Sequence, residues 1–499
     1  MQMEFKKIPI PYLQKVAGQL RSQEETMEVR LPDGMPDIGR VLGAWGQVIV
    51  RGKEWNGSDM SVSCGVMVWV LYTPEDGEGV RSVDVWLPLS MAWEIPDTGN
   101  DGKINVSCLL QGVDARSISA RKMMVRATLV AQGEGWLPGE AQIAEPEELP
   151  DDIAVLSADY PILLPREAGE KAFLLEDERS IMQSNSKPEK LLYYSLQPQI
   201  YEKKIMAGKL VFRGAGIVHV LCQGEEGSLF TCDYELPFSQ YADLEGSYDQ
   251  EAVISMIPCI TSLDISLGDN GQLQLKAGIL GQYLLHERTM VTVTEDAYSP
   301  HRKVKTEMEM LCIPAVLDQT AQTIREEVSS DKEIQRVLDV VFYPEMPQLV
   351  KKDDGIVLPL TGRFQMLYYD PNGDIRSSCV GWEGQSNLTM DEGSIVSAWI
   401  DTVGKPQQMQ VGGSVTLRGE VTVAMRTIAG QGIPMVSKLE MEEEVNPDKN
   451  RPSLILARKG NCRLWDVAKR TGSTVEAIMS ANGLGEEPED SRVLLIPVL

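Results

Sequence analysis

The sequence predicts a mainly β protein, with three tandem β-rich, sandwich-like repeats followed by a small βααβ domain. Three observations predict this fold class. Runs rich in β-branched and apolar residues, with turn residues between them, recur through the first 451 residues. Similar hairpin patterns return at an interval close to 150 residues. Only the segment 453–499 carries two consecutive stripes of apolar residues at helical spacing.

Each expected repeat contains a hairpin whose two strand-like runs flank turn residues. The hairpins pair 66–72 with 83–89, 211–221 with 228–237, and 356–369 with 375–382. The turn residues between them lie at 74–77, 224–227 and 370–373. A second strand-rich arm follows each hairpin, at 117–132, 273–294 and 414–427.

The spacing of the hairpins predicts the domain limits. Leu71, Leu221 and Leu367 are the last core residues before each turn, and they are separated by 150 and 146 residues. Polar, proline-bearing stretches at 139–152 and 314–331 are expected to link the copies. In chain order, we expect a first repeat at 1–150, a second at 151–318, a third and more diverged repeat at 319–440, an acidic linker at 441–452, and the final domain at 453–499.

The final domain is predicted to run strand, helix, helix, strand. Apolar runs at 454–457 and 493–496 indicate the two strands. The first helix is expected to start at Leu464 and to end at Gly472, which suits a left-handed cap. Ser473 and Glu476 have the spacing of a capping box that would start the second helix, and Asn482-Gly483 would end it.

This pattern resembles the LysM module, a carbohydrate-binding domain of cell-wall proteins. The matching stretches are Gly460, 464–470, 474–476, 481–484 and 493–497. The sequence departs from that family at 460–463, which has one extra residue and no Asp, and at 490–492, where Pro-Gly-Gln is usual. The resemblance implies a glycan- or partner-binding site formed by Gly460, Asn461, Cys462, Arg463, Leu464, Trp465, Asn482, Gly483 and Leu484.

Trp465 lies off the centre of the apolar stripe of its predicted helix. Two interpretations carry equal weight. Trp465 can pack at the edge of a small core, or it can be a partly exposed aromatic anchor for a protein partner or a sugar ring.

Three strand-rich repeats followed by one LysM-like module resemble the clostridial spore-coat morphogenetic protein family of endospore-forming Firmicutes. The best-matching residues are 209–221 and 235–240, with echoes at 86–90 and a diverged copy at 381–384. The resemblance implies a non-enzymatic scaffold of the spore coat. Its LysM module would dock on a coat-basement morphogenetic ATPase, in the mother-cell cytoplasm at the forespore surface. The alternative is a protein that binds peptidoglycan or cortex glycan through N-acetylglucosamine chains.

Composition excludes some partners. The formal net charge of −26 lies entirely on the first 451 residues, and such an acidic surface repels nucleic acid. No stretch approaches 18 apolar residues, so no membrane span is expected.

The opening residues lack the apolar run of a signal peptide, and the eight cysteines form no C-x-x-C pair. We therefore expect a cytoplasmic protein whose cysteines are reduced and buried.

No catalytic, metal or cofactor site is predicted. The three histidines, His219, His286 and His301, lie in strand-like or polar contexts without a motif for nucleophilic catalysis. A third class, a wall hydrolase, would need two carboxylates close together in a cleft, and no sequence feature selects such a pair.

Overall fold

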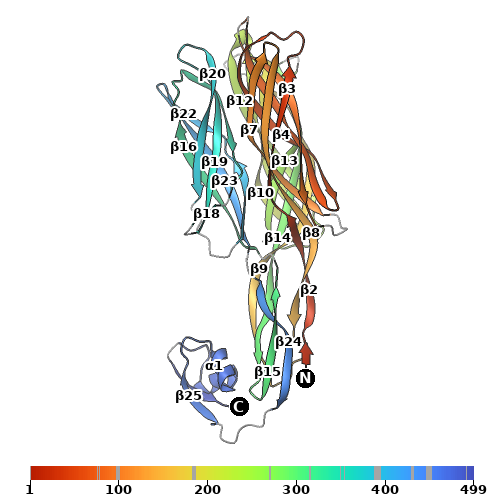
Figure 1. Cartoon of the computed structure of the whole chain (residues 1–499), viewed down its shortest axis with the longest axis vertical. Helices are drawn as coiled ribbons and strands as arrows, with labels where there is room; N and C mark the ends of the chain where they lie inside the picture. Colours follow the sequence, from red (N-terminus) through yellow and green to blue (C-terminus); the bar gives the residue numbers. More distant parts are fainter. Residues whose placement is uncertain are drawn as a thin grey trace.

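The computed structural model describes residues 2–75, 77, 79–96, 102–181, 187–268, 271–313, 316–348, 350–352, 355–386, 395–428, 432–444, 452–489 and 492–499. Strands account for 76% and helices for 4%, which confirms the prediction of a mainly β protein. The molecule is elongated (Figure 1): packed sheets form a wide head, a narrow stalk extends from it, and the C-terminal helices lie beside the far end of the stalk.

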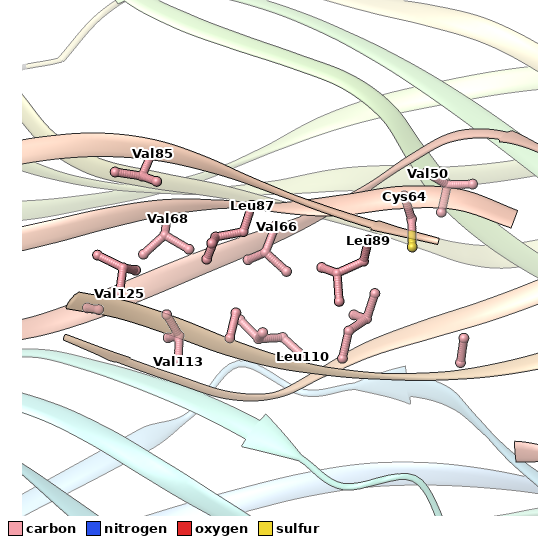
Figure 2. Close-up of a cluster of buried hydrophobic side chains, with 14 of the residues drawn as sticks. Val50, Cys64, Val66, Val68, Val85, Leu87, Leu89, Leu110, Val113 and Val125 are labelled. Atoms are coloured by element: carbon pink, nitrogen blue, oxygen red, sulfur yellow. The ribbon is translucent and has the colours of Figure 1, made fainter. Parts of the chain in front are cut away.

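Two facing sheets form the first sandwich of the head. One has the order β4-β5-β6 (Ile38–Asn56, Asp59–Pro74, Arg81–Glu94), and the other has the order β7-β8-β3 (Lys103–Ser119, Lys122–Glu145, Leu20–Arg30). Side chains alternate between the two faces of a strand, so every second residue points into the space between the sheets. In Figure 2, Val66, Val68 and Leu87 of one sheet face Leu110 and Val125 of the other, and all five are buried.

Two further sandwiches complete the head. The second packs β10-β11-β12 (Pro188–Met206, Lys209–Gly224, Leu229–Asp243) on β13-β14-β9 (Val253–Leu267, Gln272–Tyr298, Ala154–Ser180), with a short 3-10 turn, η1 (Glu225–Gly227), before β12. The third packs β17-β19-β20 (Arg336–Pro344, Gly355–Tyr369, Ile375–Ser386) on β21-β23-β16 (Ile395–Val403, Ser414–Ile428, Val316–Ser329). Two short strands, β18 (Val350–Lys352) and β22 (Gln407–Val411), pair with β19 and β23.

The same pairing order occurs in all three sandwiches. A single strand (β3, β9 or β16) is followed by a three-stranded sheet, and then by two strands that complete the sheet of the single strand. The predicted hairpins are confirmed as the antiparallel pairs β5/β6, β11/β12 and β19/β20. Residue 76, within the turn expected at 74–77, lies outside the described part of the chain.

The stalk joins strands from distant parts of the sequence. A three-stranded sheet has the order β1-β24-β15 (Gln2–Glu4, Ile433–Glu444, Arg302–Leu311), and β2 (Lys6–Ala17) pairs with the lower part of β8. The far ends of β9 and β14 continue from the head into the same region (Figure 1). Their shared core contains Ile10, Ile143, Leu164, Val293 and Leu439.

The three sandwiches meet in one apolar cluster. Leu71, Leu221 and Leu367, the positions whose spacing set the expected domain limits, are all fully buried in it. Trp45 of the first sandwich stacks on Tyr193 of the second, with ring centroids 5.6 Å apart. The head therefore has a core at its centre in addition to the core of each sandwich.

Glutamine side chains cap strand edges where the sandwiches meet. An open edge leaves backbone groups that must find partners when they are buried. Three such bonds form a closed circuit of the three sandwiches. The Leu196 N–H of the second sandwich donates to Gln47 of the first (3.0 Å), and Gln199 of the second donates to the Val403 carbonyl of the third (2.9 Å). Gln365 of the third sandwich donates to the Ala44 carbonyl of the first (2.8 Å).

The expected links between repeats were wrong. Residues 139–145 belong to β8 and pair with β2, and residues 316–329 form β16, which pairs with β23. In the 139–145 segment the exposed Glu140 and Gln142 alternate with the buried Ala141 and Ile143, and such a half-buried strand has the polar composition of a linker. Of the expected acidic linker 441–452, residues 441–444 belong to β24, and residues 445–451 lie outside the described ranges.

Candidate functional site

The C-terminal module, residues 452–499, lies against the stalk (Figure 1). It contains β25 (Leu454–Arg458), α1 (Leu464–Thr471), α2 (Val475–Asn482) and β26 (Val493–Pro497). Its core is formed by Leu464, Val467, Ala468, Ile478, Leu494 and Ile496. The same core includes Tyr298, the last residue of β14. The module is therefore packed on the strand that runs down from the head.

Local sequence sets both helices. Asp466 accepts the backbone N–H of Arg463 (3.2 Å) at the start of α1, and Gly472 ends that helix in the left-handed conformation, with φ of 67°. The prediction that Ser473 caps α2 was wrong. Thr474 is the cap and accepts the Ala477 N–H (3.1 Å), because the Ser473 N–H is bonded back to the Ala468 carbonyl in the turn between the helices.

Trp465 is buried between the module and the stalk. It is only 7% exposed. Its ring meets the ring of Tyr298 edge to face, with centroids 4.7 Å apart, and its indole N–H donates to Asp296 Oδ2 (2.9 Å). Trp465 is thus neither confined to the core of the module nor exposed. It acts as an aromatic anchor, and its partner is the protein's own β14.

Asp296 connects this anchor to a second residue of α1. Lys469 Nζ lies 2.7 Å from Oδ1 and 2.8 Å from Oδ2 of the same carboxylate. Partial burial by itself would raise the pKa of Asp296, but the hydrogen bonds from Lys469 and Trp465 outweigh it and hold that pKa below the ordinary value. The carboxylate is therefore charged at neutral pH and bonds both side chains at once.

Tyr298 and Glu295 add two further contacts. The Tyr298 hydroxyl donates to the Ser473 carbonyl (2.9 Å) in the turn between α1 and α2, and burial raises the pKa of Tyr298 to about 12. Glu295 Oε2 lies 3.3 Å from Arg463 Nη1, an ion pair whose arginine is largely exposed. Residues 295–298 thus contact both ends of α1.

The two loops expected to bind a ligand are held together. Lys459, which is 7% exposed, donates to the Pro488 carbonyl (2.9 Å) and lies 3.1 Å from Glu487 Oε1. The same Glu487 oxygen accepts the N–H of Leu464 (2.8 Å). These contacts join the loop that contains Gly460, Asn461 and Cys462 to the loop that follows Leu484. Residues 490 and 491 of the second loop lie outside the described part of the chain.

Other predicted site residues support the fold of the module. Asn482 donates to the Leu495 carbonyl (2.6 Å) and accepts the Leu495 N–H (2.8 Å), so its amide closes the outer edge of β26. Gly483 caps α2 with φ of 59°, a conformation that favours glycine. Leu464 is buried and Leu484 packs on the core. The Cys462 thiol faces the Lys459 carbonyl at 2.8 Å.

The sequence interpretation missed Glu295, Asp296 and Tyr298. They precede the residues they contact by about 170 positions, as the 169-residue separation of Asp296 and Trp465 shows. No local motif marks them, because a contact between a strand end and a distant helix leaves no periodic pattern in the sequence.

The three histidines have different surroundings. Carboxylates flank His219, with Nδ1 2.6 Å from Asp233 and Nε2 3.1 Å from Asp339. Burial opposes the protonation of His219, but the two carboxylates prevail and raise its pKa to about 10. His286 is fully buried, and burial together with Arg426 places its pKa well below the ordinary value. His301 lies exposed in the turn after β14.

A cavity of about 280 Å³ lies where the three sandwiches meet, lined by residues of β4, β7, β10, β13, β17 and β21. Among its lining residues, Asp401 is the single carboxylate. Hydrolysis of a glycan commonly uses two carboxyl groups. This cavity does not supply such a pair.

No protein-family model matches the chain, and none of the curated proteins matches it either.

Within the described ranges, no three His, Cys, Asp or Glu side chains come together as ligands for a metal ion. No helix there has the length and apolar character needed to cross a membrane. The eight cysteines are free, and Cys312 and Cys379 are exposed, contrary to the expectation that all are buried.

Proposed function

We propose that the protein is a non-enzymatic scaffold of spore-envelope (coat) assembly. In this proposal the head consists of three tandem copies of one β-sandwich repeat, and the C-terminal module is a LysM domain that docks on a coat-basement morphogenetic ATPase. The protein works in the mother-cell cytoplasm, at the forespore surface. The observation that carries the proposal is the position of the module at the end of a stalk, away from a broad head.

Three features support the repeat and scaffold parts of the proposal. The pairing order of the strands is the same in each sandwich. Leu71, Leu221 and Leu367 occupy one shared cluster, as equivalent positions of three copies would. The circuit of glutamine bonds joins the sandwiches into one body, so several partners could be held at fixed distances from the module. Binding at several such points would raise the overall avidity.

The test is a binding experiment with the whole chain and with a chain that ends at residue 451. The ATPase is immobilised in one set of measurements, and N-acetylglucosamine oligomers are titrated in another. We expect the whole chain to bind the ATPase and the shortened chain to lose binding. Binding of the oligomers without binding of the ATPase would contradict the proposal and favour the alternative, a protein that recognises peptidoglycan or cortex glycan.

A further inference from the structure

The outer face of the ribbon formed by β25 and β26 is apolar and uncovered. Leu454 and Leu456 of β25 are 49% and 70% exposed, and Val493 of β26 is 53% exposed. The opposite face of the ribbon carries Ile455 and Ile496, which pack on the core of the module. Apolar side chains on both faces are unusual for a two-stranded ribbon, because one face of such a ribbon normally meets water.

The free edge of β25 also has unused backbone groups. The Val498 N–H donates to the Ser453 carbonyl (3.1 Å), and the Lys459 N–H donates to the Arg492 carbonyl (3.1 Å). Hydrogen-bonded and non-hydrogen-bonded residues alternate along an antiparallel pair. Leu456 therefore points its N–H and C=O away from β26.

By the same alternation, Leu454 and Arg458 also point their backbone N–H and C=O groups away from β26. Among the described residues, no contact takes up these backbone groups of Leu454, Leu456 or Arg458. The edge of β26 differs, because the amide of Asn482 bonds both backbone groups of Leu495. Of the two edges of the ribbon, the one along β25 is therefore open to another strand.

We propose that β25 binds an extended segment of a partner protein by strand addition. The inference rests on the proposed function, and it names the surface through which the module docks. The incoming strand would carry apolar side chains at two alternate positions, which would pack on Leu454 and Leu456. A carboxylate at the next alternate position would face Arg458, which has no ion pair among the described residues. Main-chain bonds would supply affinity, and alternate side chains would supply specificity.

A second copy of this chain fits the edge poorly. The segment Leu454–Arg458 contains no carboxylate, so two copies of β25 paired with each other would leave both Arg458 side chains without a partner. Each chain also carries a net charge of −26, and two such chains repel each other. An apolar strand with one acidic residue, from a different protein, satisfies both the side chains and the backbone groups.

The test uses the full-length chain and the immobilised ATPase. Leu456→Pro removes the outward N–H without breaking a bond to β26, and proline is tolerated on edge strands. We expect Leu456→Pro to weaken binding about tenfold or more, since it removes a main-chain bond together with apolar contact. Leu456→Thr keeps the N–H and should weaken binding about threefold to fivefold, and Arg458→Glu about tenfold. Met409→Thr, in exposed strand β22, is the matched control and should bind like the wild type.

The outcomes separate the two proposals. If the wild-type chain does not bind the ATPase, the proposed function fails, and strand addition to this partner fails with it. If the wild type binds and Leu456→Pro, Leu456→Thr and Arg458→Glu all bind equally well, strand addition along β25 is wrong while the docking function stands. Should Leu456→Pro shift the thermal unfolding midpoint, Leu456→Thr and Arg458→Glu decide the question.

Discussion

Replacing Asp296 by alanine should release the C-terminal module from the stalk. The substitution removes the charge-assisted bond from the Trp465 indole, worth about 1.5–3 kcal/mol. It also removes the partly exposed ion pair with Lys469, worth about 0.2–1 kcal/mol. Together these losses come to roughly 2–4 kcal/mol, which lowers the ratio of docked to undocked molecules by about 30- to 700-fold.

Fluorescence quenching by acrylamide measures this release. Trp465 is shielded by Tyr298 when the module is docked, and it becomes accessible when the module leaves. The contribution of Trp465 is isolated by repeating each measurement in a Trp465→Phe background. Glu295→Gln is the matched control. It removes the charge that pairs with Arg463 and keeps an oxygen that can accept the Tyr160 hydroxyl, so we expect a change of less than about fivefold.

Unchanged quenching in Asp296→Ala would refute the reasoning that Asp296 fastens the module. The same variant separates two docking surfaces. A partner that binds the α1 face must displace β14, so release of the module would strengthen its binding. A partner that adds a strand to β25 leaves that face alone, and its affinity for Asp296→Ala should equal its affinity for the wild type.

Three further predictions concern stability. His219→Gln should lower the free energy of unfolding by about 3 kcal/mol at pH 7, because it leaves buried Asp339 without its cation. The stabilisation from protonated His219 is complete below pH 6.5 and is lost as pH rises through about 10. In chemical denaturation, the difference in unfolding free energy between wild type and variant should therefore shrink over that range. A constant difference would contradict the raised pKa of His219. Asn482→Ala should lower the thermal unfolding midpoint, because it leaves the Leu495 backbone groups unpaired at a cost of about 1–3 kcal/mol. An unchanged midpoint would argue against the role of the Asn482 amide at the edge of β26. Leu71→Ala, Leu221→Ala and Leu367→Ala should each destabilise the head by about 2–5 kcal/mol; if only one did so in denaturant titrations, the shared cluster would be in question.

Local patterns in the sequence allowed much of the fold to be predicted. The turn residues between paired runs located β5/β6, β11/β12 and β19/β20, because a hairpin is encoded by neighbouring residues. Gly472 and Gly483 marked the ends of α1 and α2, since the left-handed conformation of a helix cap favours glycine.

Contacts between distant segments were not predictable in this way. β8 continues through residues 139–145 because β2 pairs with it, yet its polar side chains on the solvent side look like a linker. The capping residue of α2 is Thr474, one position after the expected Ser473, because the end of α1 takes up the Ser473 N–H. The docking of Trp465 on Asp296 depends on a stalk that brings residues 169 positions apart together.

The long antiparallel pair of β9 and β14 has a mechanical consequence. Each strand has 27 residues, and their pairing extends from Ser180↔Gln272 in the head to Ala154↔Tyr298 beside the module, a length of roughly 90 Å. The hydrogen bonds of an antiparallel pair lie perpendicular to the strands. A pull between head and module acts along the strands, so it shears many bonds together and cannot open them one after another. The pair of strands can thus transmit tension from the module to all three sandwiches.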